Sequence, residues 1–183
     1  MSRPGAEELC WPLAGLLAEF PGASRDFAVE GVVLELGQEI VQDSPLRGRV
    51  HVSRTNRGVI VHARLATSLV APCSRCLRPA SVPLDLDLVE EVLPGIDLAS
   101  GLAVDVTAEP DAARLSDHHE LELEPIVREA IWMAEPIAPL CRPDCPGLCP
   151  ACGADLAGGP HDHGEGPADP RLEALRGFQP DDG

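Results

Sequence analysis

The sequence predicts a mostly β protein with one or two helices, whose antiparallel sheet is curved or partly closed into a barrel. Two long segments, Leu46–Ser53 and Val59–Val70, alternate apolar and polar residues with the period of two that a sheet with one buried face requires. Between them, Thr55–Gly58 contains Asn and Gly, which tolerate positive φ and so favour a hairpin turn. Leu84–Leu88 alternates leucine with aspartate, and this predicts a further strand with one apolar and one acidic face.

The first part and the middle of the chain carry weaker patterns. A short helix is expected over Trp11–Glu19 and is ended by the proline and glycine that follow Phe20. A strand is expected over Phe27–Leu36, where apolar residues recur around a single glycine. Residues 96–117 are expected to form a loop, with one strand near Val104–Thr107.

One longer helix is expected near residue 130. It begins at Pro125, because proline is tolerated in the first turn of a helix, and it stops at Pro136. One face of this helix collects apolar residues at helical spacing: Ile126, Val127, Ala130, Ile131 and Ala134. Aliphatic residues must fill most of the interior, because the chain has only three Phe, two Trp and no Tyr.

Six of the seven cysteines lie in two clusters, a C-x2-C and a C-x3-C-x3-C-x2-C. Four thiolates within twelve residues match the closed tetrahedral shell of a structural zinc site. The first expectation is therefore a C-terminal zinc knuckle over 141–156, in which Zn2+ is bound by Cys141, Cys145, Cys149 and Cys152. Because two C-x2-C pairs make a common zinc ribbon, the alternative shell is Cys73, Cys76, Cys149 and Cys152.

Other roles for these residues are weighed beside zinc binding. His161 and His163 form a His-x-His near the last cysteine pair and could be ligands, although a solvated tail is the simpler interpretation. A redox role for Cys73 and Cys76 is disfavoured, because redox C-x-x-C pairs usually begin a helix and this pair lies between expected strands. Cys10 is expected in the core.

Charge is unevenly distributed along the chain. The formal net charge is −16, and residues 81–140 contain fourteen acidic residues against two arginines. Residues 44–80, in contrast, contain seven arginines and no acidic residue. The overall excess of negative charge opposes contact with nucleic acid, but a local basic segment can still provide one contact face.

Alternation places basic residues of the two long strands on one side of a ribbon. Guanidinium groups bind phosphate in a bidentate manner, so this side is a candidate RNA or partner contact. Its candidate residues are Arg47, Arg49 and Arg64, with Arg75 and Arg78 just beyond the end of the ribbon. A rival contact surface is acidic, would suit a basic protein, and is centred on Asp85, Asp87, Glu90 and Glu91.

No catalytic constellation stands out in the sequence. It has no evident Ser/His/Asp set, phosphate loop or paired carboxylates, and a closed thiolate shell leaves zinc no room for an activated water. We therefore expect a protein that is not an enzyme and has no small-molecule substrate. Neither a signal peptide nor an apolar run of membrane-spanning length is evident, which favours a cytoplasmic protein without membrane contact.

These segments together resemble the YceD family over about residues 11–156. The opening is similar over Trp11–Leu17 and Pro21–Arg25, and the central hairpin over Ser44–Gly48 and Gly58–Val61. Cys73–Leu77 matches the C-x-R-C-L core of the family, and the closing segment matches over Leu123–Glu129 and Leu140–Leu156. Some members keep the first cysteine pair but lack the closing four, which favours the shell within the closing segment.

The resemblance implies a function without catalysis. Family members are expected to support accumulation of large-subunit (23S) ribosomal RNA during ribosome biogenesis. The alternative is an acidic escort for a basic large-subunit ribosomal protein, without direct RNA contact. The expected organisation is a β-rich domain over 1–140, the zinc knuckle over 141–156 and a flexible acidic tail over 157–183.

Overall fold

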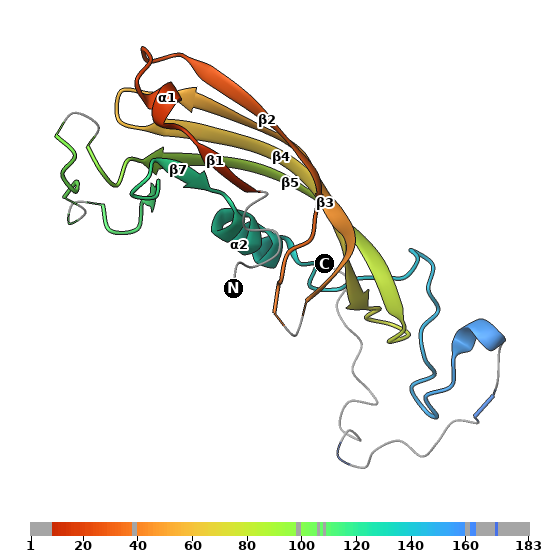
Figure 1. Cartoon of the computed structure of the whole chain (residues 1–183). Coiled ribbons are helices and arrows are strands. Elements are labelled where there is room, and N and C mark those ends of the chain that lie inside the picture. The colour runs from red at the N-terminus through yellow and green to blue at the C-terminus, as the bar shows by residue number, and fades with distance from the viewer. Residues whose placement is uncertain are drawn as a thin grey trace, which may run out of the picture.

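A curved five-stranded sheet forms the body of the protein (Figure 1). The computed structural model describes residues 9–37, 40–97, 100–105, 107, 109–159, 162–163 and 171. The sheet contains β2 (Ser24–Val32), β3 (Val41–Arg54), β4 (Val59–Pro72), β5 (Pro79–Leu93) and β6 (Ala113–Arg114) in that order. All neighbours are antiparallel except β5 and β6, which are parallel. The predicted mostly β architecture with one curved, antiparallel sheet is confirmed.

Small elements cover one side of this sheet. They are α1 (Ala14–Leu17), α2 (Glu124–Ala134) and a two-stranded ribbon of β1 (Cys10–Pro12) and β7 (Glu120–Glu122). In Figure 1, α2 and the ribbon lie on the same side of the sheet. A 3-10 turn over Leu156–Gly158 follows the last cysteine pair.

The β3–β4 hairpin follows the alternation in its sequence. In β4, every second residue from Val59 to Ala71 is buried, and Val50 and Val52 of β3 are fully buried beside them. These side chains pack against apolar residues of the covering elements: Leu13, Leu16, Leu17, Leu121, Leu123, Val127 and Ile131. Burial of apolar area contributes about 25 cal/mol per Å², so the contact between the sheet and its covering layer is the main source of folding stability.

The turn of this hairpin lies where it was predicted, but for a different reason. The backbone N–H of Thr55 donates to the carbonyl of Gly58 at 2.9 Å, and the Thr55 hydroxyl accepts from two backbone N–H groups of the turn. Neither Asn56 nor Gly58 has positive φ. Glycine is needed at 58 because a Cβ there would lie 2.3 Å from the carbonyl oxygen of Val92 on β5.

Two sequence expectations need correction. The helix expected over Trp11–Glu19 is shorter, because Trp11 belongs to β1 and only Ala14–Leu17 is helical. Trp11 instead stacks on Phe27, with ring centroids 4.9 Å apart. The strand expected near Val104–Thr107 lies later, at β6, where Arg114 pairs with Leu93 of β5.

The C-terminal helix agrees with its predicted pattern. Pro125 lies in its first turn, and Val127 and Ile131 are fully buried. Most of the expected tail over 157–183 lies outside the described residues, as does His161. Among the helices that the structure describes, none is long and apolar enough to cross a bilayer.

Candidate functional site

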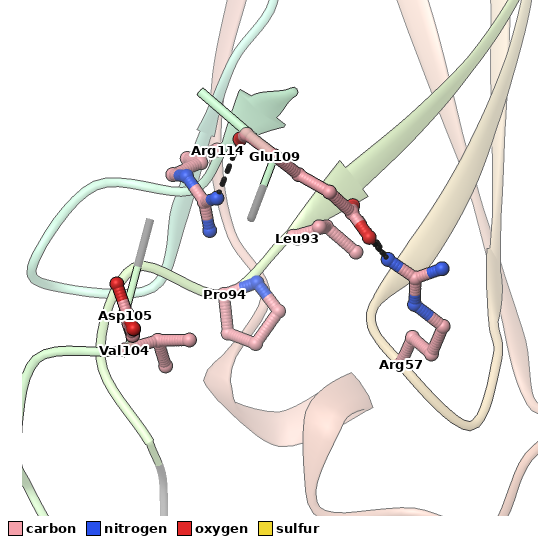
Figure 2. A pocket seen from close by; sticks show the side chains of 7 residues that line it. All are labelled: Arg57, Leu93, Pro94, Val104, Asp105, Glu109 and Arg114. Carbon is pink, nitrogen blue, oxygen red and sulfur yellow. Dashed lines mark hydrogen bonds and ion pairs between the residues drawn. The ribbon is translucent and has the colours of Figure 1, made fainter. Parts of the chain in front are cut away.

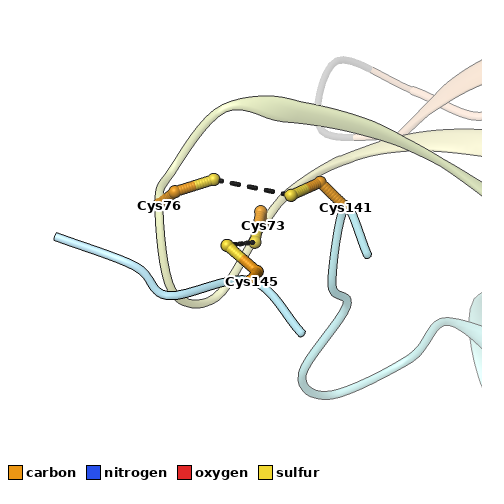
Figure 3. Close-up of side chains that lie close together, drawn as sticks. All are labelled: Cys73, Cys76, Cys141 and Cys145. Atoms are coloured by element: carbon orange, nitrogen blue, oxygen red, sulfur yellow. Dashed lines mark hydrogen bonds between the residues drawn. The ribbon is translucent and has the colours of Figure 1, made fainter. Parts of the chain in front are cut away.

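Four cysteines from two distant segments meet at the far end of the β4–β5 hairpin. Cys73 and Cys76 belong to the turn between β4 and β5, and Cys141 and Cys145 follow α2. Their four sulfur atoms all lie within 4.8 Å of one another (Figure 3). The Sγ atoms of Cys73 and Cys145 are 3.8 Å apart, and those of Cys76 and Cys141 are 3.7 Å apart.

These spacings suit a tetrahedral metal ion. A zinc–sulfur bond of about 2.3 Å places tetrahedral thiolate sulfurs about 3.8 Å apart. Figure 3 shows the four side chains converging from the hairpin turn and from the later segment. The cluster is therefore a plausible metal site, with the all-thiolate donor set that zinc favours in structural sites.

Hydrogen bonds fasten the later segment to the hairpin turn. The N–H of Ser74 donates to the carbonyl of Pro139 at 2.8 Å, and the N–H of Leu148 donates to the carbonyl of Arg75 at 3.1 Å. The Arg75 guanidinium in turn donates to the carbonyl of Cys145 at 2.9 Å. Three of the cysteines are buried here with help from Leu140 and Leu148. The cluster is thus a small core of its own.

The surroundings of the four sulfurs lower the pKa of two thiols and raise the pKa of the other two. Backbone N–H groups of Cys76 and Cys141 lower the pKa of the Cys73 thiol to about 6. The guanidinium of Arg78 lowers the pKa of Cys76. Desolvation followed by the neighbouring Cys145 thiol raises the pKa of Cys141 to about 12, and desolvation also raises the pKa of Cys145. A divalent cation would stabilise all four as thiolates, because metal binding displaces the thiol protons.

The structure divides the expected zinc shell between two groups. Cys141 and Cys145 lie with Cys73 and Cys76, whereas Cys149 and Cys152 lie in a second group with His163. Neither the expected shell nor its alternative is brought together within 4.8 Å. The physical reason is that α2 returns the chain to the hairpin turn, a long-range contact that local spacing does not encode.

The arginine face is placed as the alternation predicts. Arg49 and Arg64 are directly opposite each other on β3 and β4, as are His51 and His62. Arg47 lies two residues along β3 on the same side, and the three arginines are exposed. Like charges directly opposite each other in a sheet repel, and of these two arginines only Arg64 has an ion-pair partner among the described residues, Asp87.

Acidic residues flank this arginine face on both sides. On β2, Asp26 and Glu30 are opposite His51 and Arg47, and the Asp26 carboxylate lies 2.8 Å from the His51 ring. On β5, Asp87 is opposite Arg64, and their charged atoms are 3.7 Å apart.

The rival acidic surface therefore adjoins the arginine face. Asp85, Asp87 and Glu91 share a sheet face with Arg64, because they pair with the outward residues of β4. Glu90 is opposite the buried Val61 and so belongs to the other face. Repulsion by a separate acidic surface cannot direct the arginine face toward RNA, because the two charges alternate across one sheet.

The remaining two arginine candidates serve the cysteine cluster. Arg75 donates to the Cys145 carbonyl, and Arg78 lies 3.7 Å from Asp155. Both are exposed, but these contacts hold the later segment against the hairpin turn. Arg47 and Arg49, in contrast, form no ion pair with any described residue.

A pocket beside the β3–β4 turn is lined by Arg57, Leu93, Val104, Glu109 and Arg114, among others (Figure 2). The carboxylate of Glu109 accepts two hydrogen bonds from Arg57, each 2.6 Å long. Arg114 donates to the backbone carbonyl of Glu109 at 2.9 Å. These contacts fasten the loop before β6 to the β3–β4 turn.

Known proteins similar to the chain point to one family. The family model described as "Large ribosomal RNA subunit accumulation protein YceD" matches residues 61–179. Uncharacterized proteins of Mycobacterium bovis and Mycobacterium tuberculosis are each 33% identical over 144 residues, which are 78% of this chain and 64% of theirs. An uncharacterized protein of Mycobacterium leprae is 31% identical over 163 residues, 87% of this chain and 67% of its own. No solved structure matches the chain significantly.

Proposed function

Because this chain belongs to the YceD family, we propose that it is a non-enzymatic ribosome biogenesis factor that supports accumulation of large-subunit (23S) ribosomal RNA. The family description links its members to that RNA. The chain spans about 64% of the length of the first mycobacterial relatives, so partners are argued from its own residues. Two features carry the argument, the arginine face and the cysteine cluster.

The contact with RNA is made by Arg47, Arg49 and Arg64. The observation that carries this proposal is the direct opposition of Arg49 and Arg64 across two strands. An anion bound between the two guanidinium groups removes their repulsion and receives two charge-assisted hydrogen-bond donors. Adjacent strands are about 4.8 Å apart, so the basic face is narrow and suits one phosphodiester strand better than a duplex.

The flanking acids define the edges of that contact. Asp26 and Glu30 on β2 and Asp87 on β5 repel any phosphate that leaves the two central strands. The resulting order across the sheet is acidic, basic and acidic. This order favours one line of phosphates over nonspecific binding across the whole sheet.

Charge reversal at Arg47 and Arg49 tests the contact. The double variant Arg47→Glu and Arg49→Glu should copurify at least about tenfold less precursor 23S RNA from cells, because each lost charged hydrogen bond contributes about 1.5–3 kcal/mol. The matched control is Arg25→Glu with Arg57→Glu, which makes the same change in net charge at exposed positions outside the face and away from the cysteine cluster. The control should retain the RNA.

The alternative function, an acidic escort for a basic ribosomal protein, predicts the reverse pattern. The exposed Asp85 and Asp87 on β5 are the observation in its favour. Under this alternative, Asp85→Arg with Asp87→Arg abolishes copurification of a ribosomal protein, and the Arg47/Arg49 variant leaves it intact. That combination of results would exclude the proposed RNA contact.

Zinc is the metal proposed for Cys73, Cys76, Cys141 and Cys145. This shell replaces the one expected from local spacing. Zinc held by four thiolates carries two net negative charges. Arg75 and Arg78, which contact this cluster, provide two compensating positive charges. Metal binding supplies on the order of 10 kcal/mol to a segment with little apolar core of its own.

Elemental analysis of single variants tests this shell. Cys73→Ser and Cys145→Ser should each remove one zinc per chain, because each loses a ligand of the same ion. Cys10→Ser is the control, because Cys10 lies in neither group of possible metal ligands. An unchanged zinc content in Cys73→Ser would contradict the proposed shell.

A further inference from the structure

We propose that Cys149, Cys152 and His163 form a second, separate zinc site. Their ligand atoms all lie within 4.8 Å of one another. Two thiolates and one imidazole are donors that zinc favours in proteins, and no fourth side-chain ligand lies with them among the described residues. The site shares no residue with the four-cysteine cluster, so the two ions bind independently.

The backbone of this second turn repeats that of the first. In the hairpin turn, the N–H of Cys73 donates to the carbonyl of Arg78, and the N–H of Leu77 donates to the carbonyl of Cys73, both at 2.8 Å. In the second turn, Cys149 donates to Ala154 and Gly153 donates to Cys149, again both at 2.8 Å. The donors and acceptors have the same sequence offsets from the first cysteine of each pair.

The repetition extends to an unusual backbone angle. Leu77 has φ of 60° and Gly153, at the equivalent position, has φ of 73°. A non-glycine residue with positive φ costs energy, so the hairpin turn keeps this conformation against a local preference. The same conformation in two unrelated stretches of sequence indicates a shared requirement. That requirement is to direct two sulfurs of a C-x2-C toward one ion.

His163 completes the second site from beyond the turn. An antiparallel bridge between Leu148 and Asp155 closes the turn, and the Asp155 side chain accepts from the N–H of Ala157 at 2.9 Å. These contacts fix the turn that carries Cys149 and Cys152, and the His163 ring lies within 4.8 Å of both sulfurs. Zinc at this site therefore ties His163 to the cysteine-rich turn.

The two sites should differ in how tightly they hold zinc. Three of the four cysteines in the first cluster are buried, whereas Cys152 and His163 of the second group are exposed. Solvent access and a smaller number of protein ligands both favour exchange of the ion. The second zinc should be removed by a chelator first, and the first zinc later.

Zinc stoichiometry of the full chain tests the second site. Zinc-saturated wild-type protein should hold two ions per chain. Cys149→Ser should hold one, and His163→Ala should bind the second ion at least about tenfold more weakly, because removing one ligand costs more than about 1.4 kcal/mol. Cys10→Ser and His118→Ala are the matched controls and should hold two, because neither residue belongs to a ligand group.

Each other outcome overturns the second site. One ion in the wild type with the same content in Cys149→Ser means that the second group binds no zinc. Loss of both ions in Cys149→Ser means a single shared centre. Undiminished affinity in His163→Ala removes the histidine from the shell. Because Cys73→Ser reports on the first cluster alone, failure of that proposed shell is distinguishable. Replacement of zinc by Co2+ gives a second readout, because four thiolates and two thiolates produce different charge-transfer absorption.

Discussion

At the scale of single residues, Gly48 of β3 and Gly58 of the β3–β4 turn are required because the backbone of a neighbouring strand approaches each of them closely. A Cβ on Gly48 would lie 2.0 Å from the carbonyl oxygen of Arg64, and one on Gly58 would lie 2.3 Å from that of Val92. Backbone atoms cannot move aside without breaking sheet pairing. Gly48→Ala should therefore lower the free energy of unfolding by about 3 kcal/mol, the upper end for overpacking, as measured by urea denaturation.

Gly15 is the matched control for this prediction. It lies in α1, and a Cβ there would meet no atom within 4 Å. Gly15→Ala should be neutral or stabilising by up to about 1 kcal/mol, because alanine restricts the unfolded chain and favours helix. Equal effects of Gly15→Ala and Gly48→Ala would contradict the role of strand approach.

Replacement of Leu77 by glycine is predicted to raise the stability of the protein, in contrast to replacement of Gly48 by alanine. Its φ of 60° costs a leucine about 1–2 kcal/mol, whereas glycine at this φ loses about 0.5–1 kcal/mol through extra freedom in the unfolded chain. The leucine side chain is 66% exposed, so little burial is lost. Leu77→Gly should therefore stabilise the zinc-bound protein by roughly 0.5–1 kcal/mol. A thermal melt of the zinc-bound protein measures this, and a lower melting temperature would show that the Leu77 side chain makes a needed contact.

At the scale of elements, removal of metal should separate the cysteine cluster from the sheet. Hydrogen bonds from Ser74 and Leu148 join two chain segments that zinc also joins, whereas the centre of the sheet is stabilised by buried apolar residues. After chelation, these two amides should exchange with solvent at least about tenfold faster, because local opening then costs over 1.4 kcal/mol less. Amides of Val50 and Ala63, which pair within the sheet, serve as the internal control. Equal acceleration at both places would mean that zinc stabilises the whole fold.

At the scale of elements, some features of the structure could be predicted from the sequence and others could not. The β3–β4 hairpin and α2 were predicted because alternation and helical spacing are local signals. The grouping of the cysteines was not, because it depends on the segment after α2 meeting the β4–β5 turn. His163 follows Cys149 and Cys152 and is a candidate ligand, but the sequence favours a solvated tail for it and places the two cysteines in the four-cysteine shell. The position of Asp85 and Asp87 beside Arg64 likewise depends on the register of β5 against β4.

At the scale of the whole molecule, net charge gives the last prediction. The chain carries −16, but the proposed RNA contact uses three arginines on a narrow face. Release of counterions from single-stranded RNA contributes a slope of about −0.7 per phosphate, or about −2 for three phosphates. Salt also screens the repulsion between RNA and the rest of the protein, with a Debye length of about 8 Å at physiological ionic strength. The two effects oppose each other, so the measured slope of log affinity against log salt should be shallower than −2.

The escort alternative also predicts binding that weakens with salt, so the arginine variant, and not the salt slope alone, separates the two functions. An acidic chain of this charge attracts a basic ribosomal protein over its whole surface, so salt weakens both the long-range attraction and the contact. Fluorescence anisotropy with a single-stranded 23S fragment, between 50 and 200 mM salt, measures the RNA slope. The Arg47→Glu and Arg49→Glu variant should lose the binding at every salt concentration. A wild-type slope steeper than about −4 would require more phosphate contacts than the arginine face provides, and the RNA contact would then lie elsewhere on the protein.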